Sequence, residues 1–168
     1  MQKLFKIKSF AKINISLNII KKLKTKFHKI ESLITFLKLH DVIYIKNIKS
    51  KKHKIIFQGK FSKGIKKKNS ISQLLEIIDQ KKLAQNKKFE IKIIKNIPLK
   101  SGMGGGSMNA ASLLNFFLKK KIFKLNNLEI INICQSIGSD VILGINFQNT
   151  ILSSNNKIAR FKKKLNLY

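Results

Sequence analysis

The sequence predicts an α+β fold, a mixed β-sheet backed by helices. Three observations lead to this prediction. Strand patterns occupy the first part of the chain, helical patterns are interleaved later, and a glycine-rich turn joins a strand to a helix. This order of elements favours the α+β class. The 168 residues fit one domain, and an apolar fraction of 43% is enough for a packed core.

The first predicted strand covers residues 11–19, where apolar and polar residues alternate strictly. Such alternation indicates a half-buried strand with one apolar face. Its polar face carries Lys12 and Asn14 side by side, about 7 Å apart along the strand. Phe5 and Ile7 predict an earlier strand in the same sheet.

Three further strands are predicted. Residues 30–39 are apolar with mixed periodicity and match neither a strand nor a helix cleanly. Residues 41–47 and 53–59 have strand patterns, and we expect them to be antiparallel neighbours. Another strand is predicted at residues 89–96, shortly before Pro98, the only proline.

Helices are predicted where apolar residues recur at helical spacing. The first covers residues 70–83, with Asn69 or Ser70 as its N-cap, and the second covers residues 109–118.

A third helix and a tail complete the chain. Asn126 or Asn127 opens this helix, and Gly138 would end it. Residues 149–168 are predicted to be a polar and then basic tail, which leaves residues 1–148 as the folded domain.

The net charge of +29 comes from 36 basic and 7 acidic residues. Clustered cations favour binding to nucleic acid and attract nucleotides. However, Arg160 is the only arginine, and the lysines are spread along a chain rich in Ile and Asn. Because these residues have AT-rich codons, base composition of the genome accounts for much of the charge. Nucleic acid therefore stays an alternative partner on electrostatic grounds alone.

Cys134 is the only cysteine, so no disulfide can form within the chain, which fits a reducing cytoplasm. We interpret it as a small buried hydrophobe. No run reaches 18 apolar residues, and the first ten residues alternate instead of forming an apolar block. We therefore expect no membrane span, no signal peptide and a cytoplasmic location.

A glycine cluster separates the strand at residues 89–96 from the helix at residues 109–118; it contains Gly102, Gly104, Gly105 and Gly106. Glycines let the backbone approach a ligand, and a helix N-terminus presents free N–H groups to an anion. Two common nucleotide loops do not fit. A Walker loop needs Lys and Ser or Thr after its last glycine, where this chain has Ser107 and Met108, and Ser107 also replaces the third glycine of GxGxxG.

Four segments, in order, resemble those of the GHMP kinases. PLKSGMGGGSMNAAS resembles the family's Pro-x-x-x-Gly-Leu-Gly-Gly-Gly-Ser-Ser-Asn-Ala-Ala loop. SFAKINISLNI resembles its Ala-Lys-Ile/Leu-Asn strand, FHKIESLITFLKLHDVI its Tyr-His-x-x-x-Ser-Leu segment, and IGSDVILG its Gly-Ala-Asp-Val-Pro segment. The matches span about residues 7–145. The resemblance implies the N-terminal half of a GHMP kinase, a fold like domain 2 of ribosomal protein S5.

The segments are most similar to those of the branch that uses ATP to phosphorylate a hydroxyl of 4-diphosphocytidyl-2-C-methyl-D-erythritol in non-mevalonate isoprenoid synthesis. The resemblance implies that Lys12 and Asp140 are catalytic, and that Asn14, Phe27 and His28 bind substrate. It implies an ATP site made of Pro98, Leu99, Lys100, Ser101, Gly102, Met103, Gly104, Gly105, Gly106, Ser107 and Met108, with Asn69 on the adenine side.

These assignments are chemically coherent. Asp140 would accept or orient the proton of the substrate hydroxyl, and Lys12 would keep that carboxylate ionised and bind the transferring phosphoryl group. Phe27 could stack on cytosine and His28 could hydrogen-bond its edge. His40 and His53 have no acidic or cysteine companions at metal-ligand spacing, so we expect no protein metal site. Mg²⁺ would arrive with ATP.

The chain departs from the family pattern in four places. Met108 replaces a serine, Phe27 a tyrosine and Ile142 a proline. The sequence also stops at Tyr168, whereas the family continues into a second, C-terminal domain that closes the substrate cleft. Three hypotheses follow: a kinase completed by a partner or by homodimerisation, a weak or inactive nucleotide-binding remnant, and a basic RNA-binding module.

Overall fold

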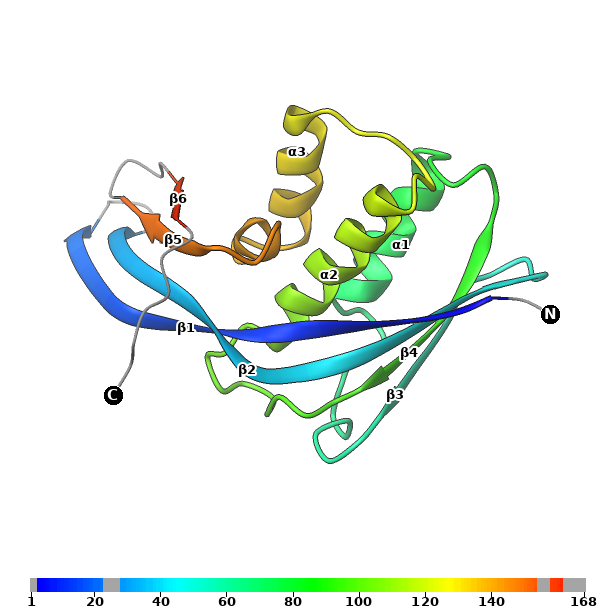
Figure 1. The fold of residues 1–168 in the computed structure, drawn as a ribbon, viewed down its shortest axis with the longest axis horizontal. Coiled ribbons are helices and arrows are strands. Elements are labelled where there is room, and N and C mark those ends of the chain that lie inside the picture. The colour runs from blue at the N-terminus through cyan, green and yellow to red at the C-terminus, as the bar shows by residue number, and fades with distance from the viewer. Residues whose placement is uncertain (1–2, 23–27, 154–157, 162–168) are drawn as a thin grey trace.

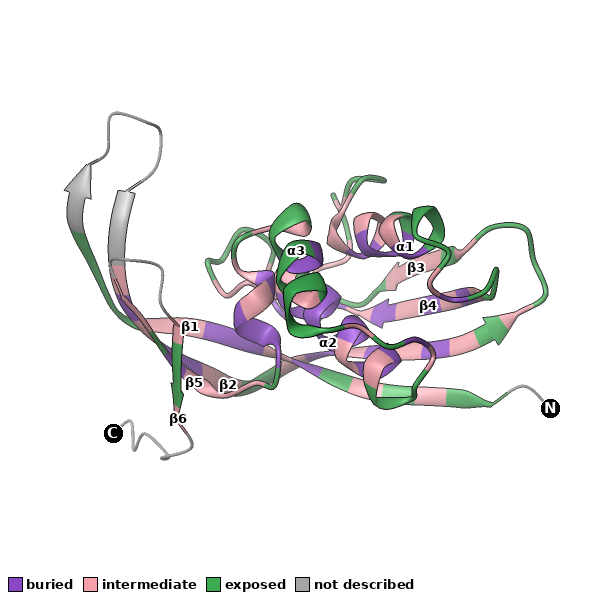
Figure 2. Cartoon of the chain, turned by 90° about the horizontal axis from the view of Figure 1, so that it is seen from above, coloured by how far each residue is buried: buried purple, intermediate pink, exposed green. Residues whose placement is uncertain are grey.

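The computed structural model describes residues 3–22, 28–153 and 158–161. They form a mixed sheet of six strands, and three helices lie over one face of it (Figure 1). This arrangement confirms the predicted α+β class. The helices and the sheet together bury the apolar core (Figure 2).

Two long antiparallel strands, β1 (Leu4–Lys22) and β2 (His28–Ile48), run the length of the molecule (Figure 1). The two strands predicted separately around residues 5–19 are one continuous strand. The segment of mixed periodicity at residues 30–39 lies inside β2. Its pattern is mixed because the pairing of β2 with β1 shifts register within it: Phe10 pairs with His40, but Lys12 pairs with Phe36.

The apolar face predicted for residues 11–19 is buried at only one end. Ala11 is fully buried, but Ile15, Leu17 and Ile19 are exposed, and Ile19 keeps 65% of its surface. The prediction of a half-buried strand is therefore wrong for this half of β1. The reason is that β1 and β2 extend beyond the helices as an arm, so no helix covers these side chains (Figure 2).

The order of the strands corrects a second prediction. We expected residues 41–47 and 53–59 to be antiparallel neighbours, but β4 (Lys88–Ile94) lies between β2 and β3 (Lys54–Gln58). β4 is antiparallel to β2 and parallel to β3. A parallel pair needs a long crossover, which α1 (Ser70–Gln80) supplies.

Helices α1 and α3 (Asn127–Ile137) begin at residues whose side chains satisfy their first free N–H groups. The Asn69 side chain caps α1 by accepting from the N–H groups of Ile71 and Ser72. Asn126 caps α3 in the same way, and Gly138 follows its last turn. Both caps confirm one of the predicted alternatives.

Helix α2 (Gly105–Lys119) begins four residues before the predicted helix start at residue 109 and packs against α1 and β1. Its buried side chains include Leu113, Leu114 and Phe117. Each contributes about 1.5–3 kcal/mol by leaving water. Buried Cys134 joins this core, which fits its interpretation as a hydrophobe, and burial raises the pKa of its thiol to about 11.

The sheet continues beyond residue 148 through two short strands, β5 (Asn149–Leu152) and β6 (Ile158–Phe161). β5 pairs with β2, and Thr150 is fully buried there. Four-residue strands carry too little alternation to be recognised inside a polar segment. Within the described part of the chain, no helix is long and apolar enough to cross a membrane.

Candidate functional site

The glycine cluster forms a tight loop that leads directly into α2. Gly102 and Gly104 have φ angles of +74° and +65°, in the left-handed region that favours glycine. Gly104 is the N-cap of α2, and it offers no side chain to occupy the free N–H groups of the first turn. These N–H groups and the positive end of the helix dipole remain available to an anion.

The loop lines a hollow of about 250 Å³. Nine of the eleven predicted ATP-site residues in the loop contribute to its wall: Pro98, Leu99, Lys100, Ser101, Gly102, Gly104, Gly105, Gly106 and Ser107. Met103 and Met108 do not. The Met103 carbonyl accepts a hydrogen bond of 3.0 Å from the N–H of Lys12, which ties the loop to β1. Met108 is fully buried, and it packs with Ile34 and Leu143.

Lys12 lies between the loop and Asp140. Its Nζ is 3.2 Å from Asp140 Oδ2 and donates a 2.7 Å hydrogen bond to Asn14 Oδ1. A Cβ added to Gly104 would lie 3.0 Å from Lys12 Cγ, so the lysine stem packs directly against the N-cap of α2. The predicted strand geometry of Lys12 and Asn14 is thus the one observed.

The two charged groups of this pair differ in exposure. The Lys12 side chain keeps 8% of its surface and the Asp140 side chain 39%. Asp140 directly precedes the short 3-10 helix η1 (Val141–Gly144), which follows the end of α3. The Asp140 carboxylate is therefore open to a ligand, whereas the Lys12 side chain is buried and held by Asn14.

Asn14 is oriented by a short chain of hydrogen bonds. Its Nδ2 donates to Ser32 Oγ over 2.8 Å, and that hydroxyl donates to the carbonyl of Ser16 over 2.7 Å. This fixes the Asn14 amide with its oxygen toward Lys12. These contacts link four side chains in series, from the segment before η1 to strand β2: Asp140, Lys12, Asn14 and Ser32.

The other predicted residues have separate positions. Asn69 lines a second hollow of about 200 Å³ that adjoins the loop, together with Lys95, Leu99 and Gly106. Its side-chain oxygen caps α1, and its Nδ2 donates to two backbone carbonyls of the preceding turn. Phe27 lies outside the described residues. His28 begins β2, and its side chain also lies outside the described part.

Sequence reasoning missed a buried polar cluster beneath the loop. It consists of Asp41, Lys95 and Asn109, which are all nearly inaccessible to water. Lys95 also lines the hollow of the loop. One signal was available: Asp41 is one of only seven acidic residues and opens a predicted strand.

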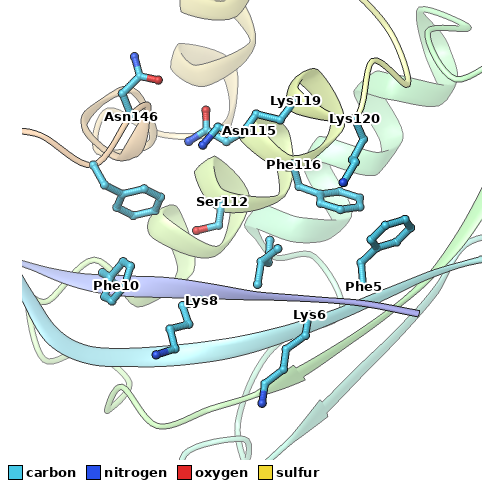
Figure 3. A pocket seen from close by; sticks show the side chains of 12 residues that line it. Phe5, Lys6, Lys8, Phe10, Ser112, Asn115, Phe116, Lys119, Lys120 and Asn146 are labelled. Carbon is cyan, nitrogen blue, oxygen red and sulfur yellow. The ribbon is translucent and has the colours of Figure 1, made fainter. Parts of the chain in front are cut away.

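A larger hollow of about 640 Å³ lies between β1 and α2 (Figure 3). Phe5, Phe10 and Phe116 form part of its wall, and lysines stand around it (Figure 3). No residue predicted for catalysis or for ATP lines it. Among the described residues, no group of three or more His, Cys, Asp or Glu side chains comes together as a metal site.

Comparisons with known proteins identify the family to which the chain is similar. The GHMP kinases N terminal domain matches residues 69–151. The chain is 58% identical over 164 residues to 4-diphosphocytidyl-2-C-methyl-D-erythritol kinase of Pelagibacter ubique (strain HTCC1062), covering 98% of this chain and 58% of that protein. It is 32% identical to the enzyme of the same name from Petrotoga mobilis, covering 96% of this chain and 61% of that one. The chain thus spans about three fifths of the length of these relatives.

Solved structures share the fold. A 4-(cytidine 5'-diphospho)-2C-methyl-D-erythritol kinase superimposes with a TM-score of 0.74 at 18% identity, covering 94% of this chain and 55% of that one. A homoserine kinase from Cytophaga hutchinsonii gives 0.64 at 14% identity, covering 95% and 51%. The sequence identity to the relatives, the matched domain and the common fold lead to one conclusion: the chain belongs to the GHMP kinase family, and its described residues have the fold of that family's N-terminal domain.

Proposed function

We propose that this chain supplies the ATP site and the catalytic pair for phosphorylation of a hydroxyl of 4-diphosphocytidyl-2-C-methyl-D-erythritol. One observation carries the proposal: the Lys12–Asp140 ion pair lies against Gly104, the N-cap of the helix that the glycine loop opens. The names of the 58% and 32% identical relatives support the choice of substrate.

The loop would bind the phosphates of ATP. The free N–H groups at the start of α2 and the dipole of that helix favour negative charge in the hollow. Lys95 and Lys100, which line the same hollow, add positive charge. Phosphoryl transfer depends mainly on positioning and on charge stabilisation of this kind.

Asp140 would accept the proton of the substrate hydroxyl. In the same step the hydroxyl oxygen would bond to the γ-phosphorus of ATP, and the bond between that phosphorus and the leaving oxygen of ADP would break. Lys12 binds Asp140 on one side and is held by Asn14 on the other, so its ammonium group is fixed close to where the phosphoryl group would pass. Asn14, Phe27 and His28 are proposed to bind the cytidylated substrate, by resemblance to the family.

Mg²⁺ would arrive with ATP, held mainly by the phosphate oxygens, and would supply neutralisation of phosphate charge. The proposal gives the chain's own residues the tasks of binding, orientation and proton transfer.

The site as described is open to solvent at Asp140. Transfer to a hydroxyl instead of water requires that water be excluded from the site. We therefore propose that a second protein surface covers it during turnover, from a second copy of the chain or from another completing partner. We also propose that the reaction takes place in the cytoplasm.

The test is an ATP titration followed by a transfer assay. The protein is mixed with labelled ATP, Mg²⁺ and 4-diphosphocytidyl-2-C-methyl-D-erythritol, and product is separated from ADP. ATP binding with product formation supports the proposal. Binding without product supports the nucleotide-binding remnant. No ATP binding, together with RNA binding that falls steeply with salt, contradicts the proposal and favours the RNA-binding module.

A further inference from the structure

We propose that Asp41 is the positioning residue of the glycine loop: it fixes the start of the loop to α2 and holds the Lys95 ammonium group beneath Gly105. This inference rests on the proposed function, because it assigns a role in ATP binding. Asp41 lies on β2, outside the loop, and it lines none of the hollows that the loop residues form.

Four contacts of the Asp41 side chain converge on the loop region. Oδ1 accepts hydrogen bonds from the backbone N–H groups of Asn96 and Ile97, at 2.7 and 2.9 Å. Oδ2 accepts from Asn109 Nδ2 at 3.0 Å and forms an ion pair with Lys95 Nζ. Asn96 and Ile97 lead into Pro98, where the loop begins, and Asn109 lies in the second turn of α2. One carboxylate therefore ties the entry of the loop to its exit.

The burial of this pair argues for a role beyond stability. The Asp41 side chain keeps 0% of its surface and that of Lys95 keeps 2%. Removing two charges from water is costly, and well-packed apolar side chains of similar volume usually serve a core at least as well. Asp41 avoids part of this cost because N–H groups satisfy both of its oxygens. A charged pair in this position is best explained by what its charges do to the loop.

Lys95 contributes a cation directly below the first turn of α2. A Cβ added to Gly105 would lie 3.3 Å from Lys95 Nζ. The ammonium group thus lies next to the positive end of the helix dipole, an unfavourable place for an isolated cation. Asp41 offsets this repulsion and determines where the cation lies relative to phosphates in the hollow, so loss of its charge would weaken the site even where the fold survives.

The experiment compares Asp41→Asn with Asp79→Asn. The first variant removes the charge but keeps an oxygen that can accept from the backbone N–H groups. The second removes the charge of another carboxylate that pairs with a lysine, since Asp79 binds His53 and Lys88 near the end of α1, away from the loop. Two measurements are made on each folded protein: the dissociation constant for ATP with Mg²⁺, and amide hydrogen exchange without ligand.

We expect Asp41→Asn to weaken ATP binding by about tenfold or more. Exchange should accelerate at residues 96–107 and stay unchanged in α3. Asp79→Asn should leave ATP binding within about twofold of the unchanged protein, and accelerate exchange only around its own contacts. The inference is overturned if Asp41→Asn binds ATP normally, or if exchange in the loop does not respond.

Failure of Asp41→Asn to fold does not end the test. The double variant Asp41→Asn with Lys95→Met removes both charges at similar volume, which usually preserves folding. It should fold and still bind ATP weakly, and normal binding would overturn the inference. If the unchanged protein binds no ATP, the proposed function fails. The exchange data then still decide whether Asp41 orders the loop.

Discussion

The Nζ of Lys12 on β1 lies 3.2 Å from Oδ2 of Asp140, which directly precedes η1, far from Lys12 in the sequence. The pair brings together residues from two of the four motif segments and places them against a third, because Lys12 also packs on Gly104 and binds the Met103 carbonyl. A single lysine thus connects the glycine loop with the acid proposed to receive the substrate proton.

This arrangement predicts different effects of two substitutions on binding and on turnover. Asp140→Asn removes the proton acceptor but lies outside the hollow of the loop. It should lower kcat by about 10²–10⁴-fold and leave the ATP dissociation constant nearly unchanged. Lys12→Ala should lower kcat and also weaken ATP binding, because the lysine supports Gly104 as well as Asp140. Single-turnover kinetics and calorimetry with ATP measure the two effects. Equal loss of ATP binding in both variants would contradict the assignment.

Gly102 and Gly104 offer a matched pair of substitutions. Both have positive φ, so alanine costs roughly 1–2 kcal/mol of stability at either position. They differ in surroundings: a Cβ on Gly102 meets nothing within 4 Å, whereas one on Gly104 lies 3.0 Å from Lys12 Cγ.

Urea unfolding should therefore show a loss for both variants, with the larger loss for Gly104→Ala. Turnover in the transfer assay should fall further for Gly104→Ala, since displacement of Lys12 also disturbs its contact with Asp140. If Gly102→Ala reduces turnover as much as Gly104→Ala does, backbone strain alone accounts for the effect and the proposed contact of Lys12 is unimportant.

Local sequence signals predicted the parts of the site that local structure determines. The alternation at residues 11–19 placed Lys12 and Asn14 on one face, and their hydrogen bond confirms it. The caps of α1 and α3 followed from side chains that bond to nearby N–H groups. The glycine loop followed from spacing, because positive φ angles before a helix favour glycine.

Contacts between distant segments were not predictable in this way. Nothing local indicates that β4 inserts between β2 and β3, since strand order depends on the crossover through α1. The burial of Lys95 was even less predictable from local sequence than the strand order. Lys95 is one of 36 basic residues, and only its tertiary environment, with Asp41 and Asn109, distinguishes it from the solvated lysines. The apolar side chains of the β1–β2 arm are exposed because the helices do not extend over them. The alternation of residues within β1 does not predict how far the helices extend.

Cys134 should be unreactive in the native protein. Burial raises the pKa of its thiol to about 11, although the charge of Arg160 opposes the shift. At pH 8 only roughly one thiol in a thousand would be ionised, and the thiolate is the reactive species. A disulfide reagent should therefore modify Cys134 slowly in buffer and rapidly in denaturing urea. Fast modification of the native protein would show that α3 opens readily.

Acid should weaken the fold partly through Asp79. Burial alone would raise the pKa of this carboxyl, but hydrogen bonds and charges of Lys88 and His53 outweigh it, so the pKa is below its usual value of 3.8. A carboxyl with a lowered folded-state pKa stabilises the protein above its unfolded pKa, and that contribution disappears as pH falls through the folded value.

The free energy of unfolding should thus fall below about pH 5 more steeply for the unchanged protein than for Asp79→Asn. The two curves should converge at acid pH, below the lowered folded-state pKa, where Asp79 is protonated in both states. Parallel curves over this range would mean that the ion pairs of Asp79 with Lys88 and His53 contribute nothing measurable in solution, as is common for exposed pairs.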